Sequence, residues 1–272
     1  MQKMLPCLLL IVALATACGT APAPTAAPTE EPALQPTATD LPPTKVPTEV
    51  LTEVPTEVPT ELPPTATPLP EGVVFRDDFN GSLQPGWTWR NEDPSRWSFV
   101  ENGWLEIAGD DISLFMEDER GMINFLTRDL PDGQFEIITH IQADPNESFE
   151  QAAIYIFEDE DNYIALNTGY CGICAVGGPG FFMETYIDNN PFRDFYQIRR
   201  EASTTEVKLK LVNNGESIIG FYALPDGDWQ RVGAFGHFFD FNSVGLGATN
   251  SNTEGVEEDV VARFDYFEIR QP

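Results

Sequence analysis

The chain is poor in the residues that many enzymes and nucleic-acid-binding proteins depend on. It has only two histidines, His140 and His237, and neither sits in a context typical of a serine or cysteine triad. Its 15 basic residues face 44 acidic ones, which gives a net charge of −29. Such a charge repels nucleic acids, anionic lipid headgroups and polyanionic glycans, and it favours neutral ligands and divalent cations. We therefore expect no nucleic acid partner.

The chain also lacks an apolar run long enough to cross a bilayer. Its strongest run, residues 8–14, has the length of a secretory signal core, and the small residues 15–17 follow it directly before Cys18. This junction resembles a bacterial lipobox, so we expect residues 1–17 to be a lipoprotein signal peptide and the Cys18 thiol to carry the lipid. The alternative is an ordinary signal peptide cleaved nearby. A lipidated Cys18 would make the protein extracytoplasmic, held at the bacterial cell membrane or cell surface through the lipid anchor only.

The segment after Cys18 has too few large apolar side chains to form a core. Residues 19–72 contain 14 of the chain's 23 prolines, and a four-residue unit related to Pro-Thr-Glu-Val repeats near their centre. Proline removes backbone donors and disfavours helix at the residue before it. We predict that residues 18–72 are the lipidated cysteine and a disordered Pro/Thr-rich linker with polyproline II character. At about 3.1 Å per residue it could extend on the order of 150 Å.

The remaining 200 residues, 73–272, are predicted to form one all-β domain. They hold 36 acidic and 13 basic residues, so the domain itself is strongly acidic. Apolar and polar residues alternate in short runs, separated by turn-forming groups of Pro, Asp, Asn and Gly, and no window shows a helical period. The clearest runs are 135–141, 152–157, 163–167, 207–212 and 263–269. This pattern predicts an antiparallel β-sandwich or jelly roll.

A series of short motifs in this domain carries a resemblance to a known family. In chain order they are Asp77-Asp78-Phe79-Asn80-Gly81, Pro85-Gly86-Trp87-Thr88-Trp89, Leu126-Thr127-Arg128-Asp129-Leu130-Pro131, Gln151 to Phe157 with Asn162-Tyr163, Pro225 to Trp229, and Phe264-Asp265-Tyr266-Phe267. Together they resemble the concanavalin A-like lectin/glucanase superfamily, in particular the non-catalytic jelly-roll module at the C-terminus of family 43 glycosidases of the β-xylosidase type. The resemblance covers 73–272 and implies a concanavalin A-like jelly roll. It does not decide the function, because sugar binders, hydrolases and adhesion modules share the fold.

The residues argue against catalysis. Glycosidases of the laminarinase group have closely spaced acids on one strand, and the most similar segment here is 182–188. Glu184 and Asp188 would share a face but lie roughly 13 Å apart along a strand, because each residue adds about 3.3 Å. A retaining pair needs about 5 to 5.5 Å and an inverting pair about 6.5 to 9.5 Å. We expect a protein that is not an enzyme, although an acid on another strand stays an open alternative.

The cysteines of the domain suggest a structural bond. Cys171 and Cys174 stand three residues apart, and no second Cys or His pair is present to complete a zinc site. In an exported protein such a pair is typical of a local disulfide. A redox role is the alternative, and the absence of a helix that would lower a thiol pKa speaks against it.

The resemblance also implies a structural calcium ion. Related jelly rolls bring the first and last strands together around Ca²⁺, which makes Asp77, Asp78 and Asp265 the expected ligands. The alternative is that Asp77 and Asp78 only cap the turn or face water. The acidic run 159–161 is interpreted as a solvated turn.

Aromatic residues suggest carbohydrate binding, because the CH faces of sugars stack on flat rings. From the resemblance, Trp97, Trp104 and Trp229 take packing positions in the core. The expected binding set is Arg128, Tyr155, Glu184 and Tyr186, exposed on the outer, concave face of the second sheet. We therefore expect a monomeric surface lipoprotein with a carbohydrate-binding module for neutral polysaccharide or cell-wall glycan. A structural or adhesive envelope protein that binds another protein is the alternative, and a glycoside hydrolase is a more remote one.

Overall fold

The computed structural model describes residues 69–100, 103–109, 121–188, 190–191, 195–250 and 260–272. The chain divides into two units after Leu62, and all described residues belong to the second, Pro63–Pro272. The predicted signal peptide, Cys18 and nearly all of the predicted linker lie outside the described residues. The described residues form only strands, turns and loops, and none of them builds a helix that could cross a membrane.

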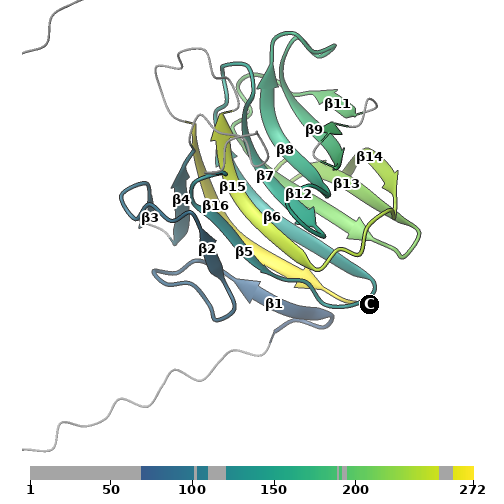
Figure 1. Cartoon of the computed structure of the whole chain (residues 1–272). Helices are drawn as coiled ribbons and strands as arrows, with labels where there is room; N and C mark the ends of the chain where they lie inside the picture. The colour runs from purple at the N-terminus through teal and green to yellow at the C-terminus, as the bar shows by residue number, and fades with distance from the viewer. Residues whose placement is uncertain (1–68, 101–102, 110–120, 189, 192–194, 251–259) are drawn as a thin grey trace, which may run out of the picture. The chain divides into compact units, whose positions relative to one another are not determined.

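The strands form two antiparallel sheets of eight strands each (Figure 1). Sheet A has the order β14 (Gln230–Gly236), β13 (Ser217–Ala223), β12 (Glu206–Asn213), β6 (Phe135–Ala143), β16 (Val261–Arg270), β4 (Trp104–Ala108), β3 (Trp97–Val100), with β1 (Val73–Asp77) also paired to β16. Sheet B has the order β10 (Asn190–Pro191), β9 (Gly178–Ile187), β8 (Tyr163–Cys171), β7 (Glu150–Phe157), β15 (Ser243–Asn250), β5 (Phe125–Asp129), β2 (Thr88–Arg90), with β11 (Tyr196–Arg199) also paired to β9.

Both sheets place strands from distant parts of the chain side by side. β16, the last strand, pairs with β6, β4 and β1, while β15 lies between β7 and β5. Hairpin-connected neighbours such as β12 and β13 complete the sheets. This interleaving is that of a jelly roll, and the predicted all-β antiparallel sandwich is confirmed.

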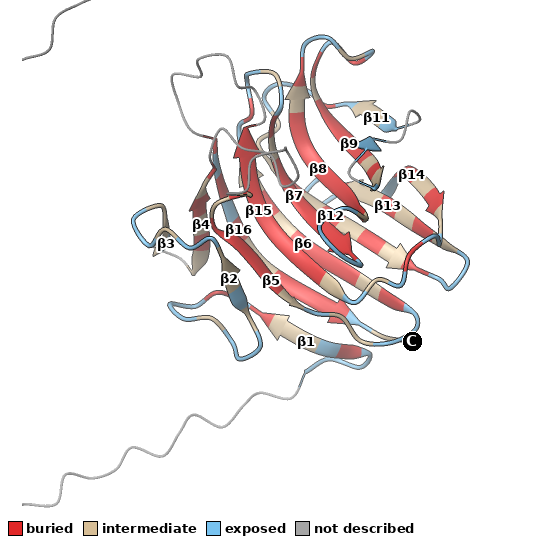
Figure 2. Ribbon diagram, in the orientation of Figure 1, coloured by how far each residue is buried: buried red, intermediate tan, exposed pale blue. Residues whose placement is uncertain are grey.

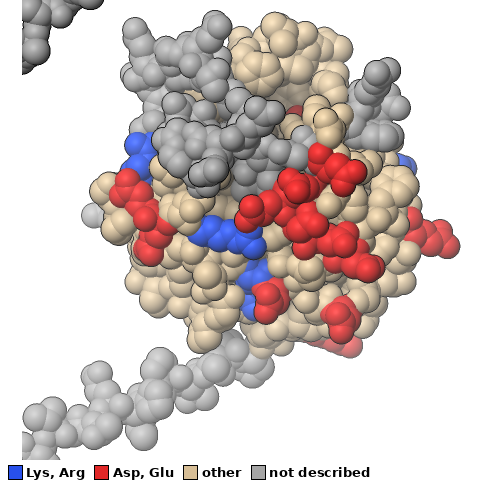
Figure 3. All heavy atoms as spheres, viewed as in Figure 1, with Lys and Arg blue, Asp and Glu red and all other residues tan. Residues whose placement is uncertain are grey.

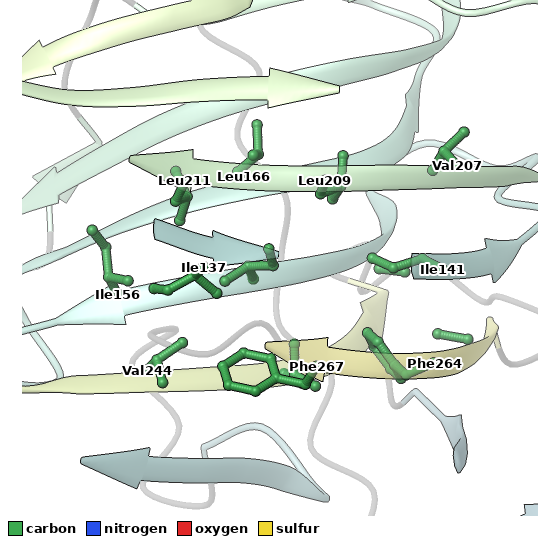
Figure 4. Packing of buried hydrophobic residues seen from close by; sticks show 14 of the residues in the cluster. Ile137, Ile141, Ile156, Leu166, Val207, Leu209, Leu211, Val244, Phe264 and Phe267 are labelled. Carbon is green, nitrogen blue, oxygen red and sulfur yellow. The ribbon is translucent and has the colours of Figure 1, made fainter. Parts of the chain in front are cut away.

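The core lies between the sheets and follows the predicted alternation. In β12, Val207, Leu209 and Leu211 are buried, while Lys208 and Lys210 between them point outward. Buried residues mark the central strands of both sheets in Figure 2. Figure 4 shows the packed layer, with Ile137, Leu209 and Phe267 of sheet A close to Ile156, Leu166 and Val244 of sheet B.

The ends of the domain lie next to each other. β1 pairs with β16 so that Val73 faces Arg270 and Asp77 faces Phe267. Beyond this pairing the Gln271 N–H donates a hydrogen bond to the Gly72 carbonyl at 2.9 Å. The C-terminus is therefore beside the start of β1, as Figure 1 shows.

Candidate functional site

The outer face of sheet B, which points away from sheet A, carries a cluster of aromatic side chains. Strands β7 and β8 are buried on both faces: Ile154 and Ile156 point into the core, and Tyr155 and Phe157 point the other way. We call the following residues the outer-face cluster: Met122, Phe125, Ala153, Tyr155, Phe157, Tyr163 and Ala165, with Tyr186 packed against them. The cluster spans β5, β7, β8 and β9 and is separate from the core.

Strand register puts two rows of this cluster side by side. In one row Tyr155 of β7 is opposite Ala165 of β8, and Ala165 is opposite Glu184 of β9. In the next row Tyr163 is opposite Tyr186, and their rings stack with centroids 4.4 Å apart and an angle of 8°. Because the Ala165 side chain is a single methyl group, it fills little of the space between the larger side chains of Tyr155 and Glu184.

Glycines in β15 let the cluster close over sheet B. A Cβ atom at Gly245 would lie 2.1 Å from the ring of Phe125, and one at Gly247 would lie 2.6 Å from the methyl carbon of Met122. Phe125 in turn meets Tyr155 edge to face, with ring centroids 5.4 Å apart. The cluster therefore depends on bare backbone beneath Phe125 and Met122.

Several polar groups of this face have no partner within the described part of the chain. The Tyr155 hydroxyl has none, although Tyr155 is only 2% exposed. Asn167, on β8 two residues beyond Ala165, is 1% exposed, and neither atom of its side-chain amide is hydrogen-bonded. No described residue forms a hydrogen bond or ion pair with the partly buried Glu184 carboxylate. Buried polar groups cost free energy unless they are paired, so groups like these are candidates to bind a ligand.

Burial sets the protonation states at this face. It raises the pKa of Glu184 from 4.5 to about 7. Burial, and then the negative charge of Glu184, raise the pKa of Tyr186 to about 12. The same two causes raise the pKa of Tyr155. Near neutral pH the tyrosines are therefore neutral, and Glu184 exists in both its acid and its carboxylate form.

The structure brings together three of the four expected binding residues and separates the fourth. Tyr155, Glu184 and Tyr186 lie on the outer face, but Tyr155 is buried rather than exposed. Arg128 points to the other face of sheet B, where its guanidinium lies 3.1 Å from the ring centroid of Phe75. The expected position of Arg128 beside the tyrosines is wrong. Arg128 is two residues from Leu126 on β5, so both side chains point to the inner face of sheet B. Burial lowers the pKa of Arg128 to about 10.

Sequence reasoning missed the amide of Asn167. In the run 163–167, Asn167 has the same phase as Tyr163 and Ala165, so alternation alone places all three on one face. A polar residue at the next position on a face of buried residues was the signal that could have identified Asn167. Glu184 and Asp188 do not form an acid pair either, since Asp188 lies beyond the end of β9 with a φ of +49°.

The expected calcium ligands do not fit a shared metal ion. Asp77 points inward and its two carboxylate oxygens accept hydrogen bonds from the backbone N–H groups of Phe79 and Gln84 and from Nε1 of Trp87, at 2.8 to 2.9 Å. Asp78 pairs with Arg76. Among the described residues no group of three His, Cys, Asp or Glu side chains could hold a metal.

Asp265 lies away from Asp77, on the outer face of sheet A. One of its carboxylate oxygens is 2.9 Å from Nδ1 of His140, and a Glu206 oxygen is 2.9 Å from Nε2 of the same ring. Because Asp77 faces the core and Asp265 faces outward, the backbone of sheet A separates the two carboxylates. Asp77, Asp78 and Asp265 therefore do not fit calcium as a set.

The cysteines and tryptophans complete the comparison with the sequence. Cys171 and Cys174 form a disulfide, with Cα atoms 5.4 Å apart. Trp97 packs against the core as expected. The expectation is wrong for Trp104 and Trp229, which lie on the outer side of sheet A: the Trp104 ring is 5.1 Å from that of His140, and the Trp229 ring is 4.8 Å from Nζ of Lys210.

Two eight-stranded antiparallel sheets packed face to face, with a second cluster on the outer face of one sheet, define a concanavalin A-like β-sandwich. Residues 76–270 match the model of the concanavalin A-like domain at the C-terminus of β-xylosidases, and the chain belongs to this family. A comparison with curated proteins gave no match.

Solved structures show the same fold. BlXynB, a GH43 protein of Bacillus licheniformis, is 23% identical with a TM-score of 0.61, over 72% of this chain and 39% of that one. A xylan β-1,4-xylosidase of Bacillus halodurans is 22% identical with a TM-score of 0.59, over 78% of this chain and 41% of that one. SCLam, an endo-β-1,3(4)-glucanase of family GH16, is 13% identical with a TM-score of 0.52, over 75% and 93%. This chain thus spans about two fifths of the length of these two GH43 proteins.

Proposed function

We propose that the domain binds a neutral polysaccharide or cell-wall glycan on the outer face of sheet B and does not cleave it. The observation that carries the proposal is the combination of the stacked Tyr163 and Tyr186 with the unpartnered groups of Tyr155, Asn167 and Glu184 on one face. Sugars need both features: a ring face to stack against their CH groups, and donors and acceptors for their hydroxyls. The Asn167 amide offers one donor group and one acceptor, and Tyr155 and Glu184 add others.

The charge of the domain supports a neutral ligand. Acidic side chains cover a wider area than basic ones on the face drawn in Figure 3. The chain as a whole has a net charge of −29, and a polyanionic glycan would be repelled before it reached the surface. The GH43 structures similar to this chain include one whose name contains xylan and one whose name contains xyloglucan, which makes unsubstituted xylan and xyloglucan suitable neutral first probes.

The geometry gives little support to hydrolysis. A glycosidase needs two carboxyl groups at a defined separation. The neighbours of Glu184 in its row are Ala165 of β8 and Tyr155 of β7, and none of the residues described on these positions is a second carboxylic acid. Glu184 therefore stands alone among the described residues as an acid on the central part of this face.

The rest of the proposal concerns location. A lipid on Cys18 anchors the protein to the bacterial membrane, and the Pro/Thr-rich linker holds a monomeric domain away from the lipid surface. The predicted signal peptide and the repeated linker support this arrangement. The protein would thus display its binding face to glycans outside the cell.

Binding is tested with detergent-solubilised full-length protein and soluble xylan and xyloglucan, by affinity electrophoresis and calorimetry. We expect Tyr186→Ala to weaken binding about 5- to 150-fold, since stacking of one ring is worth about 1 to 3 kcal/mol in the comparable case of bases. We expect Asn167→Ala to weaken it about two- to tenfold, since each hydrogen bond to the ligand is worth about 0.5 to 1.5 kcal/mol. Trp229→Ala removes a partly exposed ring from the other sheet and is the matched control.

Three results would contradict the proposal. Equal losses in Trp229→Ala and Tyr186→Ala would place the ligand elsewhere. Release of reducing sugars by the wild type, lost in Glu184→Gln, would show a hydrolase. No binding to any glycan would favour the alternative, an envelope protein that contacts another protein.

A further inference from the structure

We propose that Glu184 is a specificity-determining residue: it admits uncharged sugars to the outer-face cluster and rejects sugars that carry a carboxylate, such as uronic acids. This inference rests on the proposed function, and it goes further by naming the residue that selects the ligand and the chemical class that it excludes.

The position of Glu184 supports this role. It follows Tyr155 and Ala165 in one row across three strands, and Tyr186 stands two residues further along its own strand. Because Ala165 is small, a sugar ring stacked on the partly exposed Tyr186 would bring its substituents within reach of the Glu184 carboxylate. No described residue forms a hydrogen bond or ion pair with that carboxylate. Its hydrogen-bonding capacity is therefore available for a ligand.

Among the residues that the structure describes, no free positive charge lies beside Glu184 to compensate a ligand carboxylate. The described titratable side chains facing it are phenols: Tyr155 from β7 and Tyr186 from β9, with Tyr163 of β8 stacked on Tyr186. From β15 the facing residue in the same row is Gly245, which has no side chain. Of the described side chains, a negative group on the ligand would thus meet the neutral phenols and the charge of Glu184.

The two arginines that the structure describes on this face, Arg90 and Arg199, are already engaged. Arg90 of β2 lies over Phe157, at the far side of the cluster, and pairs with Glu160 at 3.1 Å. Arg199 of β11 donates a hydrogen bond to the Val176 carbonyl at 2.9 Å. Neither guanidinium affects the protonation of Glu184. A sugar carboxylate would have to break one of these contacts to gain a cation.

The two forms of Glu184 treat the two ligand classes differently. An ionised Glu184 accepts hydrogen bonds from sugar hydroxyls, and a protonated one still accepts and also donates, so a neutral sugar is accommodated in both states. A sugar carboxylate is repelled by the ionised form, and the repulsion is strong because this face is partly desolvated. Since burial raises the pKa of Glu184 to about 7, the rejection should weaken as the pH falls below 7.

The test compares two matched ligands by calorimetry with the full-length wild type and with Glu184→Gln. The ligands are xylohexaose and the same oligosaccharide with one glucuronic acid branch, each at pH 5.5 and pH 8.5. For the wild type we expect at least 30-fold preference for the neutral ligand at pH 8.5 and less than about fivefold preference at pH 5.5, because repulsion between two charges requires the ionised form. For Glu184→Gln the preference should be small at both pH values.

Asp129→Asn is the matched control. Asp129 is an exposed acid of β5 on the same sheet, and its removal changes the net charge by the same amount. It should leave the preference of the wild type intact. Equal effects of the two variants would show that the overall charge excludes acidic sugars, and would overturn the role of Glu184.

The remaining outcomes separate the inference from the proposed function. If the wild type binds xylohexaose but its preference is the same in Glu184→Gln, the inference fails and glycan binding stands. If the wild type binds neither oligosaccharide at either pH, nor soluble xylan or xyloglucan, the proposed function fails and the inference with it. A melting temperature of Glu184→Gln within a few degrees of wild type at pH 5.5 confirms that the variant is folded.

Discussion

At the scale of single residues, Asp77 organises the loop between the first two strands. Its buried carboxylate accepts three N–H groups, two from the backbone of that loop and one from Trp87, which packs against the core. A carboxylate that accepts several such donors acts as an anchor for the backbone around it. The loop that follows β1 is therefore attached to the core through one side chain.

Removing this carboxylate should destabilise the whole domain. We expect Asp77→Ala to lower the free energy of unfolding by about 3 kcal/mol or more, because three donors lose their acceptor in a buried place. Asp78→Ala is the control: Asp78 is half exposed and its ion pair among the described residues is with Arg76, so its loss should cost less than about 1 kcal/mol. Urea unfolding of both variants checks this, and equal losses would contradict it.

Glu184 should make stability depend on pH in a defined direction. Its folded pKa of about 7 is above its ordinary value of 4.5, so the folded state binds the proton more tightly than the unfolded state. The free energy of unfolding of the wild type therefore falls as the pH rises from about 4.5 to 7. The pKa shift alone corresponds to about 3 kcal/mol, and the actual loss is smaller because Glu184 is partly exposed. Glu184→Gln lacks this loss.

The measurement is the difference in unfolding free energy between Glu184→Gln and wild type at pH 4.5 and pH 8. We expect the variant to gain roughly 1 to 3 kcal/mol relative to wild type between these two pH values. Taking the difference removes the contributions of the other acids. A difference that is constant with pH would show that burial does not perturb this carboxyl group.

The residue scale is also where sequence reasoning had the least power. The resemblance pointed to Asp77 and Asp265 as metal ligands. The sequence alone does not distinguish an aspartate that accepts hydrogen bonds from N–H groups from one that binds a metal. Only the side of the strand decides between them, and a bulge in β16 between Phe264 and Tyr266 shifts the phase at Asp265. Such an irregularity leaves no mark in an alternating sequence.

At the scale of strands, alternation predicted the elements well and their faces poorly. The runs 135–141, 152–157, 163–167, 207–212 and 263–269 all fall within observed strands. In β12 one face is apolar and the other carries lysines, so its orientation is evident. In β7 and β8 both faces are buried, and the sequence does not distinguish the core from the outer-face cluster. Tyr155 was therefore expected to be exposed.

The glycines of β15 offer a test of how this cluster is held. In Gly245→Ala the new Cβ would overlap the ring of Phe125, which packs against Tyr155. We expect a loss of about 2 kcal/mol in unfolding free energy, because the packed ring must move, and weaker glycan binding as the cluster shifts. Gly227→Ala, whose Cβ would be 3.3 Å from Leu224 in an exposed turn, should lose less than about 1 kcal/mol. Similar losses for both would contradict the packing argument.

At the scale of the whole molecule, the fold was predictable because many weak motifs occur in a fixed order. No single motif identifies the family, yet together they span the region 76–270 that the family model matches. The binding face was less predictable, since it depends on which strands become neighbours. Tyr155, Ala165 and Glu184 meet only through the pairing of β7, β8 and β9.

The proposed lipid anchor lies outside the β-sandwich domain and has its own test. We expect Cys18→Ala to move the protein from the membrane fraction to the soluble fraction, because the proposed site of acylation is lost. Cys7→Ala, in the predicted signal peptide, should leave the protein in the membrane fraction. Unchanged detergent partitioning of Cys18→Ala would contradict the lipid anchor.

The adjacent ends of the domain have a consequence for how it can be built into larger proteins. Since Val73 and Arg270 are opposite each other in neighbouring strands, the two points where the chain enters and leaves are about 5 Å apart. The two ends of the domain are therefore almost in contact. A domain with adjacent ends can be inserted into a surface loop of a host protein without separating the two ends of that loop. It can also be circularly permuted, with the present ends joined and new ends made at another turn.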